Sequence, residues 1–141
     1  MKTYKNVNRG YMKLRVWEDA RQLYTLTWKI CGDLDFRLDR IVKNQLASVD
    51  SIHRNIAEGY CRKSLPDYLR FLNYGLASLG ESTSSIAVYQ TAGHVGTIQS
   101  EEWNDLAYKL ENGLIKLTKS LQKKQQDGSW NESLLSDQSR V

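Results

Sequence analysis

The sequence predicts an all-α protein, folded as an antiparallel up-down-up-down four-helix bundle. Of its 141 residues a single one is proline, Pro66, and this scarcity favours long uninterrupted helices because β-rich folds usually punctuate their turns with more proline and glycine. The hydrophobic share of 40% and the charged share of 26% are typical of a globular domain that buries a core. Four segments repeat apolar residues at steps of three and four, and short breaks join them.

The chain divides into a polar, irregular N-terminal arm over residues 1–12, the four-helix bundle over residues 13–124 and a polar C-terminal tail over residues 125–141. The first helix is expected from Leu14. The positions predicted to lie along its buried face recur at helical spacing and are Trp17, Ala20, Tyr24, Thr27, Trp28 and Cys31. The run Gly32-Asp33-Leu34-Asp35 then breaks the pattern.

The second helix is predicted to begin at Asp35, because an aspartate carboxylate is a favourable N-cap. Its buried face is predicted to include Leu46, Val49, Ile52 and Ile56. Gly59 follows this run, and glycine just past a helical run is the usual left-handed C-terminal cap. We therefore expect the second helix to end or bend at Gly59.

Ser64, Pro66 and Asp67 mark the start of the third helix near Leu65, because serine caps a helix and proline is tolerated in its first turn. A seven-residue rhythm typical of bundle packing follows, through Leu69, Leu72, Leu76, Leu79, Thr83 and Ile86. Between Gly75 and Ala87, nine of thirteen residues are Gly, Ala, Ser or Thr. These are mediocre helix formers, so packing must hold this segment, and its small face lets another helix come close.

The fourth helix is predicted to open at Ser100, with Glu101 and Glu102 at the positive end of its dipole. Its amphipathic pattern is the cleanest in the chain and runs through Trp103, Leu106, Leu110, Leu114, Leu117 and Leu121.

Charge is polarised along the chain, whose formal net charge is +4. Residues 1–16 carry five bases and no acid, whereas residues 71–108 carry four acids and no base. The candidate phosphate-binding residues are Lys13, Arg15, Arg54, Arg62, Lys63, Arg70, Lys116, Lys119, Lys123 and Lys124. A second interpretation stays open, in which lysines near a helix C-terminus complement its dipole and keep the protein soluble.

The patterns of known catalytic and metal sites are missing from the sequence. No Glu-x-x-His pair is present for a di-iron site, and His53 and Cys61 are about 12 Å apart along a helix, too far to share a metal. We expect no cofactor, no metal and no catalytic residue, with Cys31 and Cys61 as buried free thiols. No apolar run spans a membrane and no signal peptide opens the chain, so we expect a cytoplasmic protein without a membrane partner.

Polar residues lie between the apolar positions near the end of the second helix. Among them Asn55 and Glu58, together with Gly59, form a candidate structural motif. Asparagine is unusual inside a helix because its amide competes with backbone hydrogen bonds. In the structural interpretation, Asn55 and Glu58 hold the Gly59 turn and the start of the third helix through hydrogen bonds. In the functional interpretation, the neighbouring arginines contact a ligand or nucleic acid.

The run Asn55-Ile56-Ala57-Glu58-Gly59, preceded by Ser51-Ile52 and followed by Arg62, resembles the signature of the 23S rRNA intervening-sequence proteins, also called the four-helix bundle protein family. Supporting matches are Val16-Trp17 with Ala20, Phe36, Phe71-Leu72, and Ser78-Leu79 with Glu81. The resemblance extends from about Leu14 to Leu121. The chain departs from the family pattern at His53, Thr83 and Ala47.

This resemblance implies an antiparallel bundle that assembles into a homopentameric ring, without enzymatic activity. Related members are encoded inside inserts of ribosomal RNA genes, and a distant branch is similar to accessory proteins of diversity-generating retroelements, which bind nucleic acid and a reverse transcriptase. We therefore expect a non-enzymatic oligomer whose partners are copies of itself, RNA or DNA at the basic surface, and a reverse transcriptase or another protein.

Two other hypotheses stay open. In the first, the protein is an adaptor that does not bind nucleic acid and docks a partner protein through exposed aromatic residues such as Tyr4, Tyr11 or Trp130. In the second, it is an enzyme that uses Glu58 and His53.

Overall fold

The computed structural model describes residues 2, 4 and 6–130, and within these ranges it contains helices and no strand. The four long helices are α1 (Arg15–Gly32), α2 (Asp39–Cys61), α3 (Leu65–Thr91) and α4 (Thr97–Gln126). Two short 3₁₀ helices, η1 (Val7–Lys13) and η2 (Phe36–Leu38), precede α1 and α2. Most of the predicted C-terminal tail, residues 131–141, lies outside the described residues, as do residues 1, 3 and 5 of the arm.

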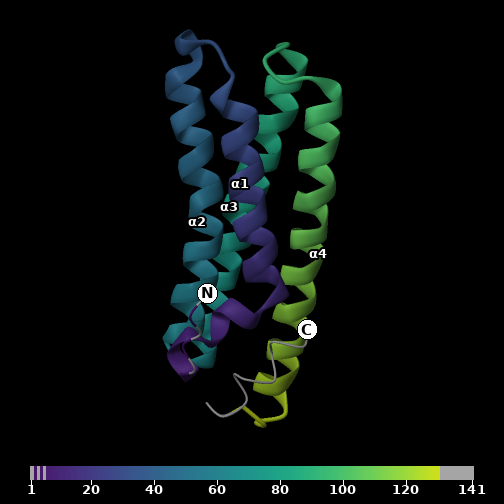
Figure 1. Cartoon of the computed structure of the whole chain (residues 1–141). Helices are drawn as coiled ribbons and strands as arrows, with labels where there is room; N and C mark the ends of the chain where they lie inside the picture. The colour runs from purple at the N-terminus through teal and green to yellow at the C-terminus, as the bar shows by residue number, and fades with distance from the viewer. Residues whose placement is uncertain (1, 3, 5, 131–141) are drawn as a thin grey trace.

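The four long helices form an antiparallel bundle, as the sequence predicts (Figure 1). Each helix packs against two neighbours, so that α1 contacts α2 and α4 while α3 contacts α2 and α4. The connections are short, and short connections force consecutive helices to run in opposite directions. Both ends of the described chain therefore lie at the same end of the bundle, where α1 and α3 begin and α2 and α4 end. No described helix is long and apolar enough to cross a membrane.

The core is a continuous apolar layer to which all four helices contribute. A buried hydrogen bond joins α1 and α4 across this core: the indole Nε1 of Trp103 on α4 donates to the hydroxyl of Thr27 on α1 at 2.9 Å. Thr27 in turn donates to the carbonyl of Leu23 at 2.7 Å. Both Thr27 and Trp103 are fully buried, so this pair fixes the register of α1 against α4 while satisfying the polar atom of the largest core side chain.

The small residues of α3 serve mainly to bring α2 close. Gly75 faces the Cβ of Asn55, and Ser78 and Ser82 accept or donate hydrogen bonds with serines of α2 at 2.6 and 2.9 Å. The buried amide of Gln45 donates to the carbonyl of Ser82 at 3.0 Å. The expectation that another helix packs closely on this face is confirmed, and that helix is α2 of the same chain. The outward half of α3, including Ala77 and Ser84, stays exposed.

The prediction that Gly59 ends α2 is wrong. The helix continues to Cys61, and the residue in the left-handed region is Lys63, with φ of 64°. Gly59 is buried instead, because α3 passes so close that a Cβ there would lie 2.9 Å from the Cβ of Phe71 and 3.2 Å from the backbone oxygen of Tyr68. This glycine is required by helix packing rather than by backbone conformation.

The start of α4 also differs from the prediction. The helix begins at Thr97, and the backbone N–H of Gly96 donates to the side-chain oxygen of Gln99 at 3.3 Å. Ser100 lies inside the first turn, where its hydroxyl donates to the side-chain oxygen of Gln90 and ties α4 to the end of α3. The Ser100 hydroxyl is the type of group that caps a helix, but its hydrogen-bond partner, Gln90, lies on α3.

Two further expectations near the first two helices are corrected. Trp28, placed on the buried face by its spacing, is 60% exposed, because the buried face of α1 is centred on Ala20, Leu23 and Thr27. Asp35 caps η2 rather than α2, since its carboxylate accepts from the N–H of Arg37 at 2.8 Å.

Candidate nucleic-acid interface

The topology gathers the predicted phosphate-binding residues in one half of the bundle. These residues lie at the end of η1, near the starts of α1 and α3, in the connection between α2 and α3, or in the second halves of α2 and α4. All of those segments meet at the end that carries both termini (Figure 1). The residues so gathered are Lys13, Arg15, Arg54, Arg62, Lys63, Arg70, Lys116, Lys119, Lys123 and Lys124. The topology therefore brings Lys13 and Arg15 to the same end of the bundle as the lysines of α4.

The register of α1 against α4 places the start of α1 beside the lysines of α4. A Cβ on Gly113 would lie 2.9 Å from Cγ1 of Val16, and Lys109 reaches the buried Asp19 with an N···O distance of 3.4 Å. Because the two helices are antiparallel, Arg15 precedes this contact and Lys116 follows it toward the same end of the bundle.

Three of the ten candidates are engaged in ion pairs. Arg54 contacts Asp50 at 2.6 Å, and Arg70 contacts Asp67 at 3.0 Å. Arg62 lies 3.2 Å from Glu58 and 4.0 Å from the same Asp67. Nearby carboxylates thus largely balance the positive charges of Arg54, Arg62 and Arg70, although such exposed pairs exchange readily with other anions.

The other candidates form no ion pair with any residue that the structure describes. We call these residues the basic end: Lys13, Arg15, Lys63, Lys116, Lys119, Lys123 and Lys124. All are exposed except Lys124, which is half-buried. Lys123 and Lys124 occupy the last turn of α4, where their charges complement the helix dipole, as the second interpretation of the lysines expects.

Sequence reasoning missed Arg9 as a member of this surface. The N-terminal segment, predicted as an irregular arm, contains η1, which packs on α1 and α2. It brings exposed Arg9 to the same end, with its guanidinium 4.3 Å from the ring centre of Tyr4. The absence of acids in residues 1–16 was the available signal, but nothing in the sequence showed that this segment docks.

Asn55 and Glu58 do not hold a turn together. The Asn55 amide donates to the carbonyl of Ser51 within α2 at 2.8 Å, so this part of the structural interpretation is wrong. Glu58 reaches the start of α3 indirectly, through Arg62 and Asp67. Asn55 instead contributes to the close α2–α3 contact at Gly75.

His53 and Glu58 line one shallow cleft with Tyr11, Trp17, Arg54 and Ala57, but each has a separate partner. The His53 ring Nε2 lies 2.8 Å from the carboxylate of Asp50, which also accepts from Arg54. Burial raises the pKa of Asp50, but the hydrogen bonds and charges of His53 and Arg54 together outweigh it and hold the pKa below its usual range. The geometry is that of a helix-surface ion cluster.

A chain of edge-to-face aromatic contacts closes this end of the bundle. It runs from Trp17 through Tyr11, Tyr60 and Tyr68 to Trp130, with ring centres 5.7 to 6.4 Å apart. Tyr11 and Trp130 are therefore packed rather than free, which corrects the expectation that they are exposed docking residues, whereas Tyr4 is exposed. These aromatic contacts join η1 and the segment after α4 to the core.

Both cysteines are free thiols, as predicted, and burial raises the pKa of each. Cys31 is buried, whereas Cys61 is half-buried and lies 3.2 Å from the backbone oxygen of Asn8 in η1. Within the described ranges, no three acidic, histidine or cysteine side chains come together as a metal site would require.

Comparison with known families shows which family the chain belongs to. The family model described as 23S rRNA-intervening sequence protein matches residues 12–119, which include α1, α2, α3 and most of α4. Of the basic end, only Lys123 and Lys124 lie outside this range. No curated protein matches the chain. The matched range contains the Asn55 to Gly59 run, whose glycine is fixed by the contact between α2 and α3. The chain therefore belongs to the 23S rRNA-intervening sequence protein family.

Proposed function

We propose that this protein is a non-enzymatic, oligomeric scaffold that binds RNA or DNA through its basic end. The observation that carries the proposal is the convergence of seven bases without a described ion-pair partner at one end of a bundle whose other half carries Glu101, Glu102 and Asp105. Phosphate contacts by lysine and arginine release counterions, which supplies most of the free energy of sequence-independent nucleic-acid binding.

The test compares two variants with equal changes in charge. In the first, Lys116, Lys119, Lys123 and Lys124 are replaced by glutamine. In the second, the four bases of the opposite half, Lys29, Arg37, Arg40 and Lys43, are replaced by glutamine. Binding to a labelled RNA and a DNA of the same sequence is measured by fluorescence anisotropy over a range of salt concentrations.

The slope of log affinity against log salt is negative, and the first variant is expected to make it less steep by about four. Each lost phosphate contact reduces its magnitude by about one. The second variant is expected to leave the slope near that of the unchanged protein. Equal losses in both variants would show that net charge alone attracts the nucleic acid and would refute the assignment to the basic end. Circular dichroism confirms that each variant is folded.

We further propose that the protein assembles into a homopentameric ring. A closed ring of one chain needs two different surfaces that complement each other. Two exposed apolar areas support this proposal: one lies at Trp28 and Phe36, which are 60% and 86% exposed, and the other lies on the outer face of α3 at Tyr74 and Val88. Light scattering on nuclease-treated protein tests it, since a ring has five times the 16.3 kDa mass of one chain and a monomer does not.

An adaptor role without nucleic acid is the second candidate function. Tyr4 supports it as an exposed aromatic side chain beside Arg9. Two results together would favour the adaptor over the nucleic-acid scaffold. The first is an affinity for RNA and DNA that does not change with salt, and the second is capture of a defined partner protein that Tyr4→Ala abolishes.

A further inference from the structure

The outer face of α4 carries large apolar side chains and acids that no other described element covers. Glu101, Asp105, Tyr108, Asn112 and Ile115 follow one another at steps of three and four, so they form one stripe along the helix. Tyr108 is 66% exposed and Ile115 is 38% exposed. These two side chains are seven residues apart, which is about 10.5 Å along the helix axis and matches the spacing of anchors in a helix that lies alongside.

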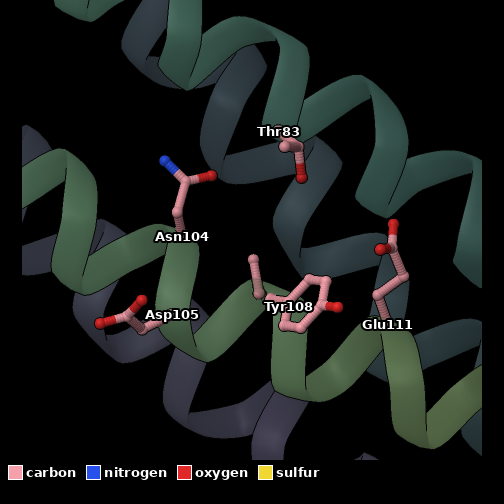
Figure 2. Close-up of a pocket in the computed structure, with 6 residues that line it drawn as sticks. Thr83, Asn104, Asp105, Tyr108 and Glu111 are labelled. Atoms are coloured by element: carbon pink, nitrogen blue, oxygen red, sulfur yellow. The ribbon is translucent and has the colours of Figure 1, made fainter.

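A shallow hollow of about 290 Å³ lies next to this stripe, between α3 and α4. Its lining residues are Thr83 of α3 and Asn104, Asp105, Ala107, Tyr108 and Glu111 of α4. Figure 2 shows the hydroxyl of Thr83 pointing from α3 toward α4, and the hydroxyl of Tyr108 on the side of Glu111.

Thr83 and Asn104 present acceptors to the hollow, because their own donors are used inside the helices. The hydroxyl of Thr83 donates to the carbonyl of Leu79 at 2.8 Å, and the amide nitrogen of Asn104 donates to the carbonyl of Ser100 at 2.9 Å. The lone pairs of the Thr83 hydroxyl and the carbonyl oxygen of Asn104 are left for a ligand.

The charges of the hollow are negative and unbalanced by described residues. Neither Asp105 nor Glu111 forms an ion pair with a residue that the structure describes. Residues 71–108 contain no lysine or arginine, and Lys109 reaches away to Asp19 on the α1 side. A group that donates several hydrogen bonds and carries positive charge fits these acceptors, and the ring of Tyr108 adds a cation–π surface.

We propose that this face of α3 and α4 docks a basic amphipathic helix of a partner protein, with a lysine or arginine side chain in the hollow and apolar side chains over Tyr108 and Ile115. Charge complementarity selects this occupant, since the same acids repel phosphate. The proposal goes beyond nucleic-acid binding: it places a protein on the acidic face while the basic end stays free for RNA or DNA.

The experiment uses the full chain and two probe peptides of about four helical turns, with leucines at helical spacing. One peptide carries lysine at its polar positions and the other carries glutamine. Calorimetry gives the dissociation constants, and the side-chain amide signal of Asn104 in a ¹⁵N spectrum reports occupancy of the hollow. The lysine peptide is expected to bind and shift this signal, and the glutamine peptide is expected to bind at least tenfold more weakly, as for loss of a charge-assisted contact.

Two matched double variants locate the contact. Asp105→Asn with Glu111→Gln is expected to weaken the lysine peptide about tenfold. Glu81→Gln with Glu102→Gln removes the same charge from exposed positions of α3 and α4 that lie outside both the hollow and the stripe, and is expected to change the dissociation constant less than about twofold. Tyr108→Ser leaves the charge unchanged and is expected to weaken the peptide through its apolar contact.

Equal weakening by the two double variants would reduce the effect to general charge attraction and overturn the proposal. Equal binding of the lysine and glutamine peptides would overturn the cationic anchor. If Nα-acetyl-lysine amide alone bound as tightly as the peptide, the hollow would take a free cation, and the docked helix would be refuted. None of these variants touches the basic end, so failure here leaves the nucleic-acid proposal unaffected.

Discussion

Replacement of Gly59 by alanine tests the account of how α2 and α3 meet. The new methyl group would lie 2.9 Å from the Cβ of Phe71, 3.1 Å from Cδ1 of Tyr68 and 3.2 Å from the backbone oxygen of Tyr68. Neither the backbone oxygen nor a Cβ can turn away, so the helices must separate. Overpacking of this kind costs about 2–3 kcal/mol in the upper part of its usual range. Alanine recovers about 1 kcal/mol of helix propensity.

The net loss is therefore about 1–2 kcal/mol, which lowers the Tm of a chain of this length by roughly 3–7 °C. Gly80→Ala is the matched control, because no atom lies within 4 Å of a Cβ at that exposed position of α3. The control is expected to raise stability by about 1 kcal/mol. Urea unfolding and thermal scans by circular dichroism measure both variants. A Gly59→Ala protein as stable as the unchanged chain would refute the argument that packing requires this glycine.

Two further predictions concern buried polar contacts. Thr27→Val removes the acceptor of the Trp103 indole and is expected to cost about 1–3 kcal/mol in urea unfolding, whereas Thr25→Val at an exposed position of α1 changes little; equal effects would contradict this account. Asp50 has a lowered pKa, so its stabilising effect is present above its unfolded pKa of about 3.9 and is lost as pH falls through the folded value. Asp50→Asn is therefore expected to reduce stability at pH 7 and to flatten its decline in acid, and an unchanged acid decline would refute this assignment.

The helices themselves were predictable because their evidence is local. Ser64 caps α3, with its hydroxyl accepting from the N–H of Asp67 at 3.5 Å, and the apolar positions of α4 from Trp103 to Leu121 are buried nearly as their spacing indicates. Hydrophobic periodicity and capping residues act within one or two turns.

The errors arose where a neighbouring helix decides the role of a residue. Gly59 has the chemistry of a C-cap, yet it is buried because α3 crosses it. Ser100 has the chemistry of an N-cap, yet its hydroxyl bonds to Gln90. Trp28 has the spacing of a core residue, but Ala20 and Leu23 set the direction of the buried face. Local propensity is weak beside such contacts.

The candidate interface was predictable by residue type but not by arrangement. The sequence placed Lys13 and Lys123 more than one hundred positions apart, and the antiparallel topology brings their segments to one end. Four-residue spacing allows Glu58 to pair with either Arg54 or Arg62, and the pair with Arg62 forms. Arg54 pairs with Asp50 instead, and Arg70 pairs with Asp67, because side-chain geometry selects among the carboxylates within one turn.

The dependence of nucleic-acid affinity on salt tests the central proposal most directly. If all seven residues of the basic end contact phosphates, log affinity is expected to fall against log salt with a slope of about −6 for duplex DNA and about −5 for a single strand. A slope near zero, with affinity unchanged between low and high salt, would contradict binding through the basic end.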